Sequence, residues 1–356
     1  MPQRNPRHNG GFCDQFGAAD VTITWTHIEE SSDGPDPELP ARVAAAVGDP
    51  FHSVVRKHLL ERRTDPSHAF PRFEEHFGRY LFGQLHVPTS VDDGVAEFAE
   101  LTVIATLDSC WTILRVPEVS DGRPTPVADS YRDRLRELKL TLAANATVGE
   151  LLGRLFTITV NQLEKVFETT AESIRNCTDA LADLNTKRLG RAMQERIPEL
   201  RDRAGEIRRE VASLGTVVDE IESILDEIVS DRLDLRLSSG EDGGTELLSR
   251  ATEIHLHDTY YRARRLSLLH DEQLESLGYV FEMIALLNAA DEVTSGRFLG
   301  AIASIMLFPT FIVGLYGMNF ETMPELRWPL GYAFAGALIV GTTIAQVSYF
   351  RRKRWL

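Results

Sequence analysis

Two long segments without charged residues lie at the end of this chain, and they constrain its fold more than any other feature. Phe298–Phe320 and Trp328–Phe350 each run for 23 residues without Asp, Glu, Lys or Arg. About 20 apolar residues in a helix are enough to cross the hydrocarbon core of a bilayer. We therefore predict two transmembrane helices, 298–320 and 328–350, joined by an external loop at 321–327.

The rest of the chain has the composition of a soluble protein. The mean hydropathy of the whole sequence is -0.16 and 26% of its residues are charged, so the apolar residues are concentrated at the end. The first 297 residues are numerous enough to bury a core. Because Met1–Gly10 is polar and basic, with no apolar leader after it, we expect this large part to stay in the cytosol.

Basic residues set the expected orientation in the membrane. Arg351, Arg352, Lys353 and Arg354 directly follow the second segment, whereas loop 321–327 holds two Glu and one Arg. The positive-inside preference places the basic tail, 351–356, in the cytosol, and two spans return the N-terminal part to the same side. We predict a multi-pass protein of the cell inner (plasma) membrane with both termini cytoplasmic. A nucleic-acid patch is the alternative interpretation of such a cluster, but its position beside a span favours the topogenic one and no nucleic-acid partner.

The N-terminal part combines strand and helix patterns. Residues 1–18 are polar and aperiodic, so we expect a disordered tail. Residues 19–128 are expected to form a cytosolic α/β domain, because β-branched and alternating runs are interspersed with short helical patterns. The expected strands are Ala19–Ile28, Tyr80–Val87 and a hairpin over Leu101–Val116, and the expected helices lie near 40–47 and 51–62.

Helical patterns dominate from Asp129 onward. Residues 129–244 form a predicted cytosolic helical region, with long amphipathic stretches at Thr147–Leu184 and Pro198–Leu237. Residues 245–297 form a predicted stalk helix that continues directly into the first span, because Pro309 is the only proline between Thr245 and Gly317. The predicted fold class is α+β: an α/β cytosolic domain, a long stalk helix and two C-terminal transmembrane helices.

Two patterns in the helical region point to interactions. Leu277, Val280, Ile284 and Leu287 recur at spacings of three, four and three, which is typical of a coiled-coil seam and favours self-association. Residues 219–234 contain seven acids against the single Arg232, in a chain with a net charge of -15. Such a run is either a solvated helix face or a surface that gathers cations near a pore mouth, and the sequence leaves both open.

A stripe of mostly small side chains follows one face of the first span. Its members recur at intervals of four and three: Gly296, Gly300, Ala303, Leu307, Thr310 and Gly314. Two spans from one chain cannot enclose a path, so a pore would need several copies around an axis. The same spacing also suits close helix packing, and it does not separate the two interpretations. Leu307, and Leu299 below it, are candidates for closing a pore by dewetting, although single leucines in a span often face lipid or pack.

Asn319 lies at the outer end of this stripe. A ring of amide oxygens could hold the water shell of a small divalent cation without removing it. Mg²⁺ suits such a ring, because it loses water reluctantly and prefers octahedral oxygen geometry. Gly317 allows the backbone to turn where the helix ends. Glu321 and Glu325 in the outer loop would raise the local cation concentration, or simply keep the loop solvated.

The residues around Asn319 carry a resemblance to a known family. Across Pro309–Leu356 the chain resembles the CorA magnesium and cobalt transporters in the identity and spacing of its residues. The residues that carry this resemblance are Tyr316-Gly317-Met318-Asn319-Phe320, Met323-Pro324-Glu325-Leu326, Trp328 and Gly331-Tyr332. Upstream the resemblance is one of layout. It implies a homopentamer with a cytosolic funnel, and a selectivity filter of Gly317, Met318 and Asn319 with Asn319 as the outer ring. It also implies passive uptake of Mg²⁺, with Co²⁺ and Ni²⁺ as further candidates, and gating by Mg²⁺ bound between cytosolic domains.

The sequence departs from the family pattern at two places. Asp291–Ser304 aligns only with a shift, so Asp291, Glu292 and Thr294 are the candidates for an inner-mouth position where relatives often have Asn. Among regulatory acids, Asp258 falls near the family position on the stalk, and Asp92 or Asp93 is its candidate partner. His255 and His257 flank Leu256 nearby, but side chains at i and i+2 point to different helix faces, which favours a solvated surface over zinc.

The leading prediction is therefore a homopentameric divalent-cation channel in a lipid bilayer that mediates Mg²⁺ uptake. We expect no enzyme, since the sequence has neither a G-x-x-x-x-G-K-[ST] phosphate loop nor an H-E-x-x-H motif. One alternative is the zinc-transporting branch of the superfamily, which shares the Gly-Met-Asn motif but generally lacks the Met-Pro-Glu-Leu motif found here at Met323–Leu326. Another is a membrane-anchored Mg²⁺ sensor that binds the ion through acidic helices without conducting it.

Overall fold

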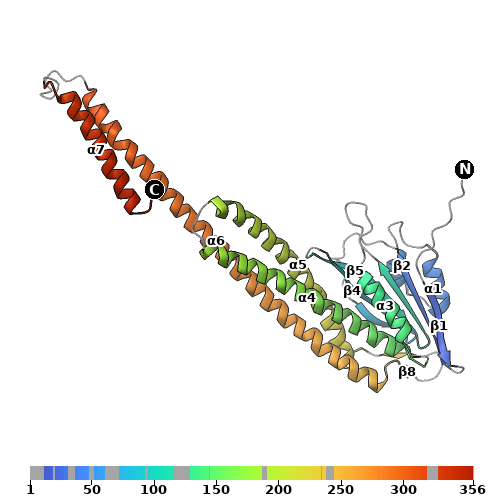
Figure 1. Ribbon diagram of the computed structural model, residues 1–356. Helices are drawn as coiled ribbons and strands as arrows, with labels where there is room; N and C mark the ends of the chain where they lie inside the picture. The colour runs from blue at the N-terminus through green and yellow to red at the C-terminus, as the bar shows by residue number, and fades with distance from the viewer. Residues whose placement is uncertain are drawn as a thin grey trace, which may run out of the picture. The chain divides into compact units, whose positions relative to one another are not determined.

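The computed structural model describes residues 12–18, 21–30, 37–47, 52–60, 72–92, 95–115, 129–143, 145–186, 191–233, 235–237, 244–318 and 328–355. The chain divides into two compact units, and Figure 1 labels their helices and strands. Unit 1 comprises Met1–Asp179 and Asp202–Tyr279, and unit 2 comprises Ala180–Arg201 and Val280–Leu356.

Unit 1 is built on a mixed sheet of six strands. The strands follow the order β1-β2-β6-β5-β4-β3, and all neighbours are antiparallel except the parallel pair β2 and β6. Their bounds are Phe12–Ala18 for β1, Val21–Glu30 for β2, Arg72–His76 for β3, Tyr80–Asp92 for β4, Val95–Ala105 for β5 and Ser109–Arg115 for β6. The expected hairpin of β-branched strands is confirmed by β5 and β6.

Helices account for most of the remaining described chain. The short helices are α1 at Leu39–Val47, α2 at Ser53–Leu60 and α3 at Asp129–Thr141. The long ones are α4 at Val148–Thr186, α5 at Arg191–Val229 and α6 at Arg250–Tyr316, followed by α7 at Gly331–Arg352. A small hairpin of β7, Arg236–Leu237, and β8, Thr245–Glu246, lies between α5 and α6. This confirms the predicted fold class, including one helix of 67 residues that enters the first apolar segment.

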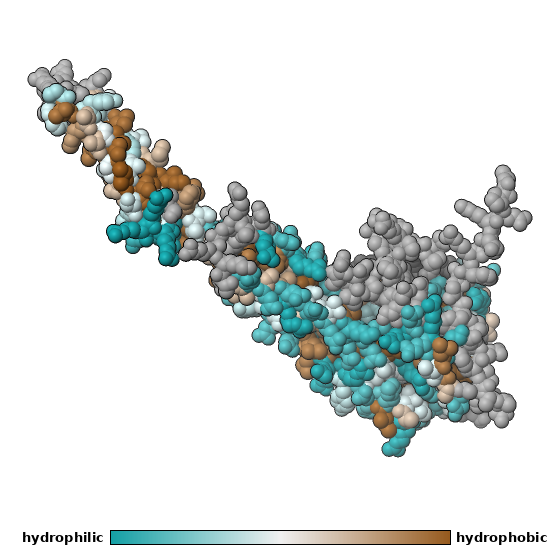
Figure 2. All heavy atoms as spheres, viewed as in Figure 1, coloured by the Kyte–Doolittle hydropathy of each residue, from teal (hydrophilic) through white to brown (hydrophobic). Residues whose placement is uncertain are grey.

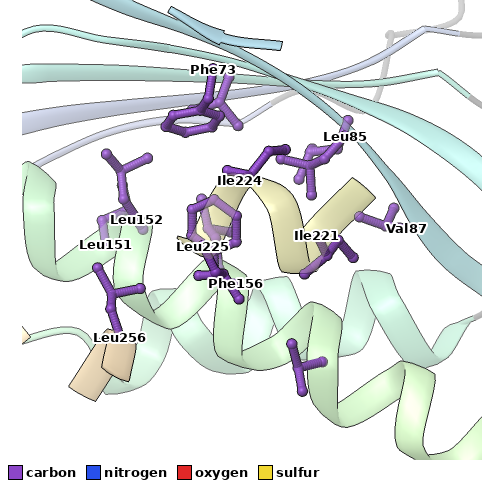
Figure 3. Packing of buried hydrophobic residues seen from close by; sticks show 14 of the residues in the cluster. Phe73, Leu85, Val87, Leu151, Leu152, Phe156, Ile221, Ile224, Leu225 and Leu256 are labelled. Carbon is purple, nitrogen blue, oxygen red and sulfur yellow. The ribbon is translucent and has the colours of Figure 1, made fainter. Parts of the chain in front are cut away.

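The sheet has a hydrophobic core on each face, because successive strand residues point to opposite sides. On one face Phe73, Leu85 and Val87 lie against side chains from the long helices, including Phe156 of α4 and Ile221 of α5 (Figure 3). The other face packs against α1 and α2. Its buried side chains are Leu39, Val43, Val47, Val55 and Leu59 from the helices and Ile28, Tyr80, Phe82, Ile104, Trp111 and Ile113 from the strands.

Close backbone contact fixes the start of α6 against α4. A Cβ on Gly149 would lie 2.2 Å from the backbone oxygen of Leu247, so only glycine fits there. Further along, Oγ1 of Thr157 lies 2.9 Å from Nε2 of His255. The Arg262 guanidinium donates to both carboxylate oxygens of Glu164, at 3.1 and 2.6 Å. The two helices are thus joined by sterically tight and charged contacts within unit 1.

Two sequence predictions were wrong. The expected disordered tail, residues 1–18, includes β1, which pairs with β2 along its whole length from Phe12 to Ala18. The partner strand supplies the backbone hydrogen bonds that the aperiodic sequence did not signal. Residues 1–11 lie outside the described part of the chain.

The second correction concerns the predicted self-association seam. Leu277, Val280, Ile284 and Leu287 are between 0 and 5% exposed in the single chain. Val280, Ile284 and Leu287 belong to unit 2 together with segments 180–186 and 191–201, whose buried side chains include Leu181, Leu184 and Ile197. The chain itself therefore buries the seam, which leaves it unavailable as a contact between copies.

Candidate ion pathway

Among the described residues, two helices are long and apolar enough to cross a membrane. They are α6, through its C-terminal part, and α7. The 22 residues of α7 span about 33 Å at about 1.5 Å per residue, close to the roughly 30 Å of a bilayer core. Only 11% and 6% of their most apolar windows are buried within the chain, so neither is the core helix of a soluble domain. Figure 2 shows apolar side chains gathered on the outer surface of these helices.

The spanning part of α6 packs against α7 along one face. Ala301 and Ile312 are buried there, as are Gly331 and Phe350 at the two ends of α7. The amide Nε2 of Gln346 donates a hydrogen bond to the backbone oxygen of Ser304 at 3.3 Å, which fixes how the two antiparallel helices are aligned along their length.

The predicted stripe occupies a different face of α6. With about 100° between successive residues, its centre lies about 150° around the helix from the face that contacts α7. A Cβ placed on Gly296, Gly300 or Gly314 meets no atom within 4 Å. Leu299 and Leu307 are 64% and 66% exposed, and Ala303 and Thr310 are exposed as well. The small residues therefore do not serve packing against α7, and no described residue of the chain covers the face that they form.

Hydrogen bonding along the stripe is local. The Thr310 hydroxyl donates to the backbone oxygen of Met306 at 2.7 Å, which leaves its lone pairs as the only side-chain acceptor on this face. At the outer end the Gly317 N–H donates to the oxygen of Val313 at 2.9 Å, and α6 ends. Met318 is 46% exposed. Asn319, Glu321 and Glu325 lie outside the described residues, so the predicted ring and loop acids stay predictions.

The structure describes most of the candidate inner-mouth and regulatory residues. Asp291, Glu292 and Thr294 are on the surface of α6, and the Thr294 hydroxyl donates to the oxygen of Ala290 at 2.9 Å. Asp258 is exposed on α6. The pKa of Arg262 is raised chiefly because its guanidinium donates hydrogen bonds to the Glu164 carboxylate, and the charges of Glu164 and Asp258 add to this effect. Asp92 ends β4 opposite Val95, and Asp93 lies outside the described residues. Within the part that the structure describes, no three His, Cys, Asp or Glu side chains are grouped to hold a metal.

One acid among the described residues of the acidic run 219–234 is buried. Glu220 is 5% exposed and accepts a hydrogen bond from the backbone N–H of His86 at 3.1 Å, while its second oxygen lies 2.8 Å from Nδ1 of that ring. Burial alone would lower the pKa of His86, but the Glu220 carboxylate raises it overall. Glu222, two residues on, accepts from the Ser267 hydroxyl of α6. These two acids therefore join α5 to its neighbours, which neither interpretation of the run foresaw.

The family of the chain follows from a match across both units. A profile of the family described as CorA-like Mg2+ transporter protein matches residues 58–352, from α2 to the end of α7. The chain belongs to this family. Among curated relatives, the cobalt/magnesium transport protein CorA of Thermotoga maritima is 46% identical over 69 residues, which span 19% of each chain. The magnesium transport protein CorA of Haemophilus ducreyi is 25% identical over 240 residues, or 66% of this chain and 67% of that relative.

A solved structure agrees with this membership at the level of fold. The CorA magnesium transporter from Methanocaldococcus jannaschii matches with a TM-score of 0.69 at 15% identity, over 97% of this chain and 98% of that one. In this CorA-like chain, the sequence located the stripe and both spanning helices. The contact between α6 and α5 through Ser267 and Glu222 could not be predicted, because the two residues are distant in sequence.

Proposed function

We propose that five copies of this chain form a channel that conducts hydrated Mg²⁺ across the inner membrane, down the membrane potential and without nucleotide hydrolysis. The observation that carries the proposal is the stripe of mostly small residues on α6, which faces away from α7 in a member of the CorA-like family. A face that the chain leaves open beside its own second span is available to surround an axis. The relatives named for magnesium transport support the choice of ion.

The residues of this face suggest how the ion passes. Glycine and alanine leave room for an ion with its water shell, which Mg²⁺ keeps in preference to protein ligands. Asn319 from each copy would hold that shell through its amide oxygen at the outer entrance. Leu299 and Leu307, both exposed on α6, would close the path by excluding water when they approach the axis. No catalytic residue is required for such passage.

Regulation by Mg²⁺ would depend on acids from different copies. Asp258 on α6, with Asp92 at the end of β4 or the following Asp93 in sequence, would supply the carboxylate oxygens that Mg²⁺ prefers. Since the described residues of one chain include no group of three such ligands, the proposed ion would bridge neighbouring copies. Bound Mg²⁺ would then hold the copies together, and its loss at low concentration would release them.

The pore is tested by measuring Mg²⁺ influx into liposomes that contain the purified protein. Asn319→Ala should abolish influx, because the substitution removes the oxygen that holds the water shell, while the protein still assembles. Asn145→Ala is the matched control, since Asn145 is exposed on unit 1 and its loss should leave influx unchanged. Normal influx through Asn319→Ala would contradict the assigned selectivity ring.

The same assay separates the alternatives. A series with Mg²⁺, Co²⁺, Ni²⁺ and Zn²⁺ gives the ion preference, and Zn²⁺ flux driven by a proton gradient with little Mg²⁺ flux would indicate the zinc-transporting branch. If Mg²⁺ stabilises the protein against unfolding but never crosses the bilayer, the chain is a sensor and not a channel.

Regulation is tested by limited proteolysis with and without Mg²⁺. Asp258→Ala should reduce the protection that Mg²⁺ gives, because one bridging carboxylate is lost. Asp271→Ala is the control, since the Asp271 side chain is 81% exposed on the same helix. Equal protection of the wild type and Asp258→Ala would remove Asp258 from the regulatory ligands.

A further inference from the structure

The C-terminal end of α7 has a defined cap. The Trp355 N–H donates to the oxygen of Phe350 at 3.0 Å, and the Arg354 N–H donates to the oxygen of Arg351 at 3.1 Å. Together with the left-handed φ of 58° at Arg354, these bonds form a Schellman motif. The Trp355 ring stacks on Phe350, with centroids 5.6 Å apart and planes at 22°. Residues 353–355 after α7 are thus held against the helix end by backbone bonds and a ring contact.

Arg354 occupies a position that glycine would fill with less strain. The left-handed residue of a Schellman motif is usually glycine, because a Cβ crowds the backbone in that conformation. The hydrogen bonds of this cap use the backbone alone. Relative to glycine, arginine therefore adds nothing to the cap itself, and what it does add is a positive charge on an exposed side chain.

The cap presents four consecutive cations in one place. Arg351, Arg352, Lys353 and Arg354 are all exposed, and none has an ion-pair partner within the described ranges. The bond between Gln346 and Ser304 places Lys353 level with Arg297 of α6. Lys353 follows Gln346 by seven residues and Arg297 precedes Ser304 by seven, and the two helices are antiparallel. Figure 2 shows a strongly hydrophilic patch at this end of the apolar helices.

This cluster lies where a bilayer presents its headgroups. Trp355 is 37% exposed at one end of α7, and Trp328, 48% exposed, lies before its other end against Phe334. Tryptophans at the two ends of a span are typical of the two membrane interfaces. The four cations are adjacent to Trp355, so they reach the depth of the lipid phosphates.

We propose that Arg351–Arg354 form a binding site for the phosphate of anionic phospholipids in the leaflet that adjoins the end of α7. Guanidinium groups bind phosphate oxygens through paired hydrogen bonds. The Schellman cap, with Trp355 anchored on Phe350, holds these groups at the interface. The site rests on the proposed membrane location of the two helices but does not depend on ion conduction. A failure of the channel proposal would therefore leave this site untouched.

The test uses the full-length protein in detergent, titrated with phosphatidylglycerol or with phosphatidylcholine of the same acyl chains and followed by native mass spectrometry. The wild type should prefer phosphatidylglycerol. Arg354→Gly should weaken that binding about fivefold, the usual contribution of one interfacial cation, while its thermal midpoint stays equal or rises because the strain is relieved. Arg354→Lys, which keeps the charge, should bind as the wild type does.

Controls identify the ligand and the place. Arg265→Gln removes an exposed cation of α6 in unit 1 and should leave the preference unchanged. Inorganic phosphate should not displace the lipid at equal concentration. An unchanged preference in Arg354→Gly, an equal loss in Arg265→Gln, or displacement by free phosphate would each overturn the assignment to anionic lipid.

Discussion

Unit 1 and the spanning helices of unit 2 differ in how they bury their apolar side chains. Unit 1 buries apolar residues on both faces of its sheet, and among its buried charged groups Glu100 pairs with His58 and Arg115 while Glu220 pairs with His86. The spanning helices expose large apolar side chains, such as Phe311 at 65% and Ile344 at 61%. Unit 1 thus encloses its apolar side chains by itself, whereas the spanning helices lack the apolar environment that they require. A bilayer supplies that environment, and further copies of the chain would add to it.

Unit 1 also contains a buried charge cluster. The carboxylate of Glu100 on β5 lies 3.1 Å from Nε2 of His58 and accepts a hydrogen bond from Arg115 at 3.0 Å. Arg115 also donates to the backbone oxygens of His58 and Leu59, both at 3.2 Å, where α2 ends. Burial would raise the pKa of Glu100, but His58 and Arg115 lower it to about 2. The cluster joins α2 to the sheet.

The largest expected effect comes from breaking this cluster. Glu100→Gln keeps the shape of the side chain but removes the negative charge 3.0 Å from the half-buried Arg115 guanidinium, which should lower the free energy of unfolding by about 3–5 kcal/mol. Urea denaturation, followed by the fluorescence of the buried Trp25 and Trp111, measures this change. Glu137→Gln is the control, because its exposed pair with Arg134 should contribute less than about 1 kcal/mol.

Acid offers a second measurement of the same cluster. The folded pKa of Glu100 lies below the usual 4.5, so the carboxylate stabilises unit 1 above pH 4.5 and loses that effect as the pH falls toward 2. The contribution is on the order of 3 kcal/mol. Glu100→Gln should therefore show a weaker pH dependence between these values than the wild type. Parallel curves for the two proteins would mean that Glu100 is not the titrating group.

A smaller effect separates glycines in the two regions. Gly149→Ala places a Cβ 2.2 Å from the Leu247 oxygen, so the backbone must move, at a cost of about 1–3 kcal/mol in the free energy of unfolding. Gly300→Ala meets nothing within 4 Å in the chain and should leave the thermal midpoint unchanged or slightly raised, because alanine favours helix.

The outcome at Gly300 also distinguishes the two interpretations of the stripe. If Gly300→Ala lowers the thermal midpoint of the assembled protein as much as Gly149→Ala does, the small residues pack closely against another copy. An unchanged midpoint and an unchanged oligomer mass by light scattering favour a water-filled path beside them.

Local patterns carried much of the fold. The spanning helices, the β5–β6 hairpin and the long helix α6 follow from apolar runs, alternation and the scarcity of proline, all of which act within a few residues. The stripe was predictable for the same reason, since periodicity gives the face of a helix. Periodicity does not give the partner of that face. The seam at Val280 and Ile284 was therefore assigned to other copies although the chain itself covers it.

Contacts between residues that are distant in sequence could not be predicted from the sequence. Glu220 and His86 are 134 positions apart, and an acid within an acidic run signals a solvated surface until its partner is known. The cap at Arg354 was missed because its usual signal is glycine at that position. β1 was missed because an edge strand needs only the backbone of its neighbour, which no side-chain pattern in Phe12–Ala18 reports.

The smallest expected effect lies between the spanning helices. Gln346→Leu removes the bond to the Ser304 oxygen, and membrane hydrogen bonds of this kind contribute about 0.6 kcal/mol on average. The substitution also removes the buried Oε1 of Gln346, which has no partner among the described residues, so the two changes oppose each other. The thermal midpoint should shift little. A loss of assembly in Gln346→Leu would instead show that this oxygen accepts a hydrogen bond from a neighbouring copy, and the spanning helices would then pair polar groups across copies as unit 1 does within one.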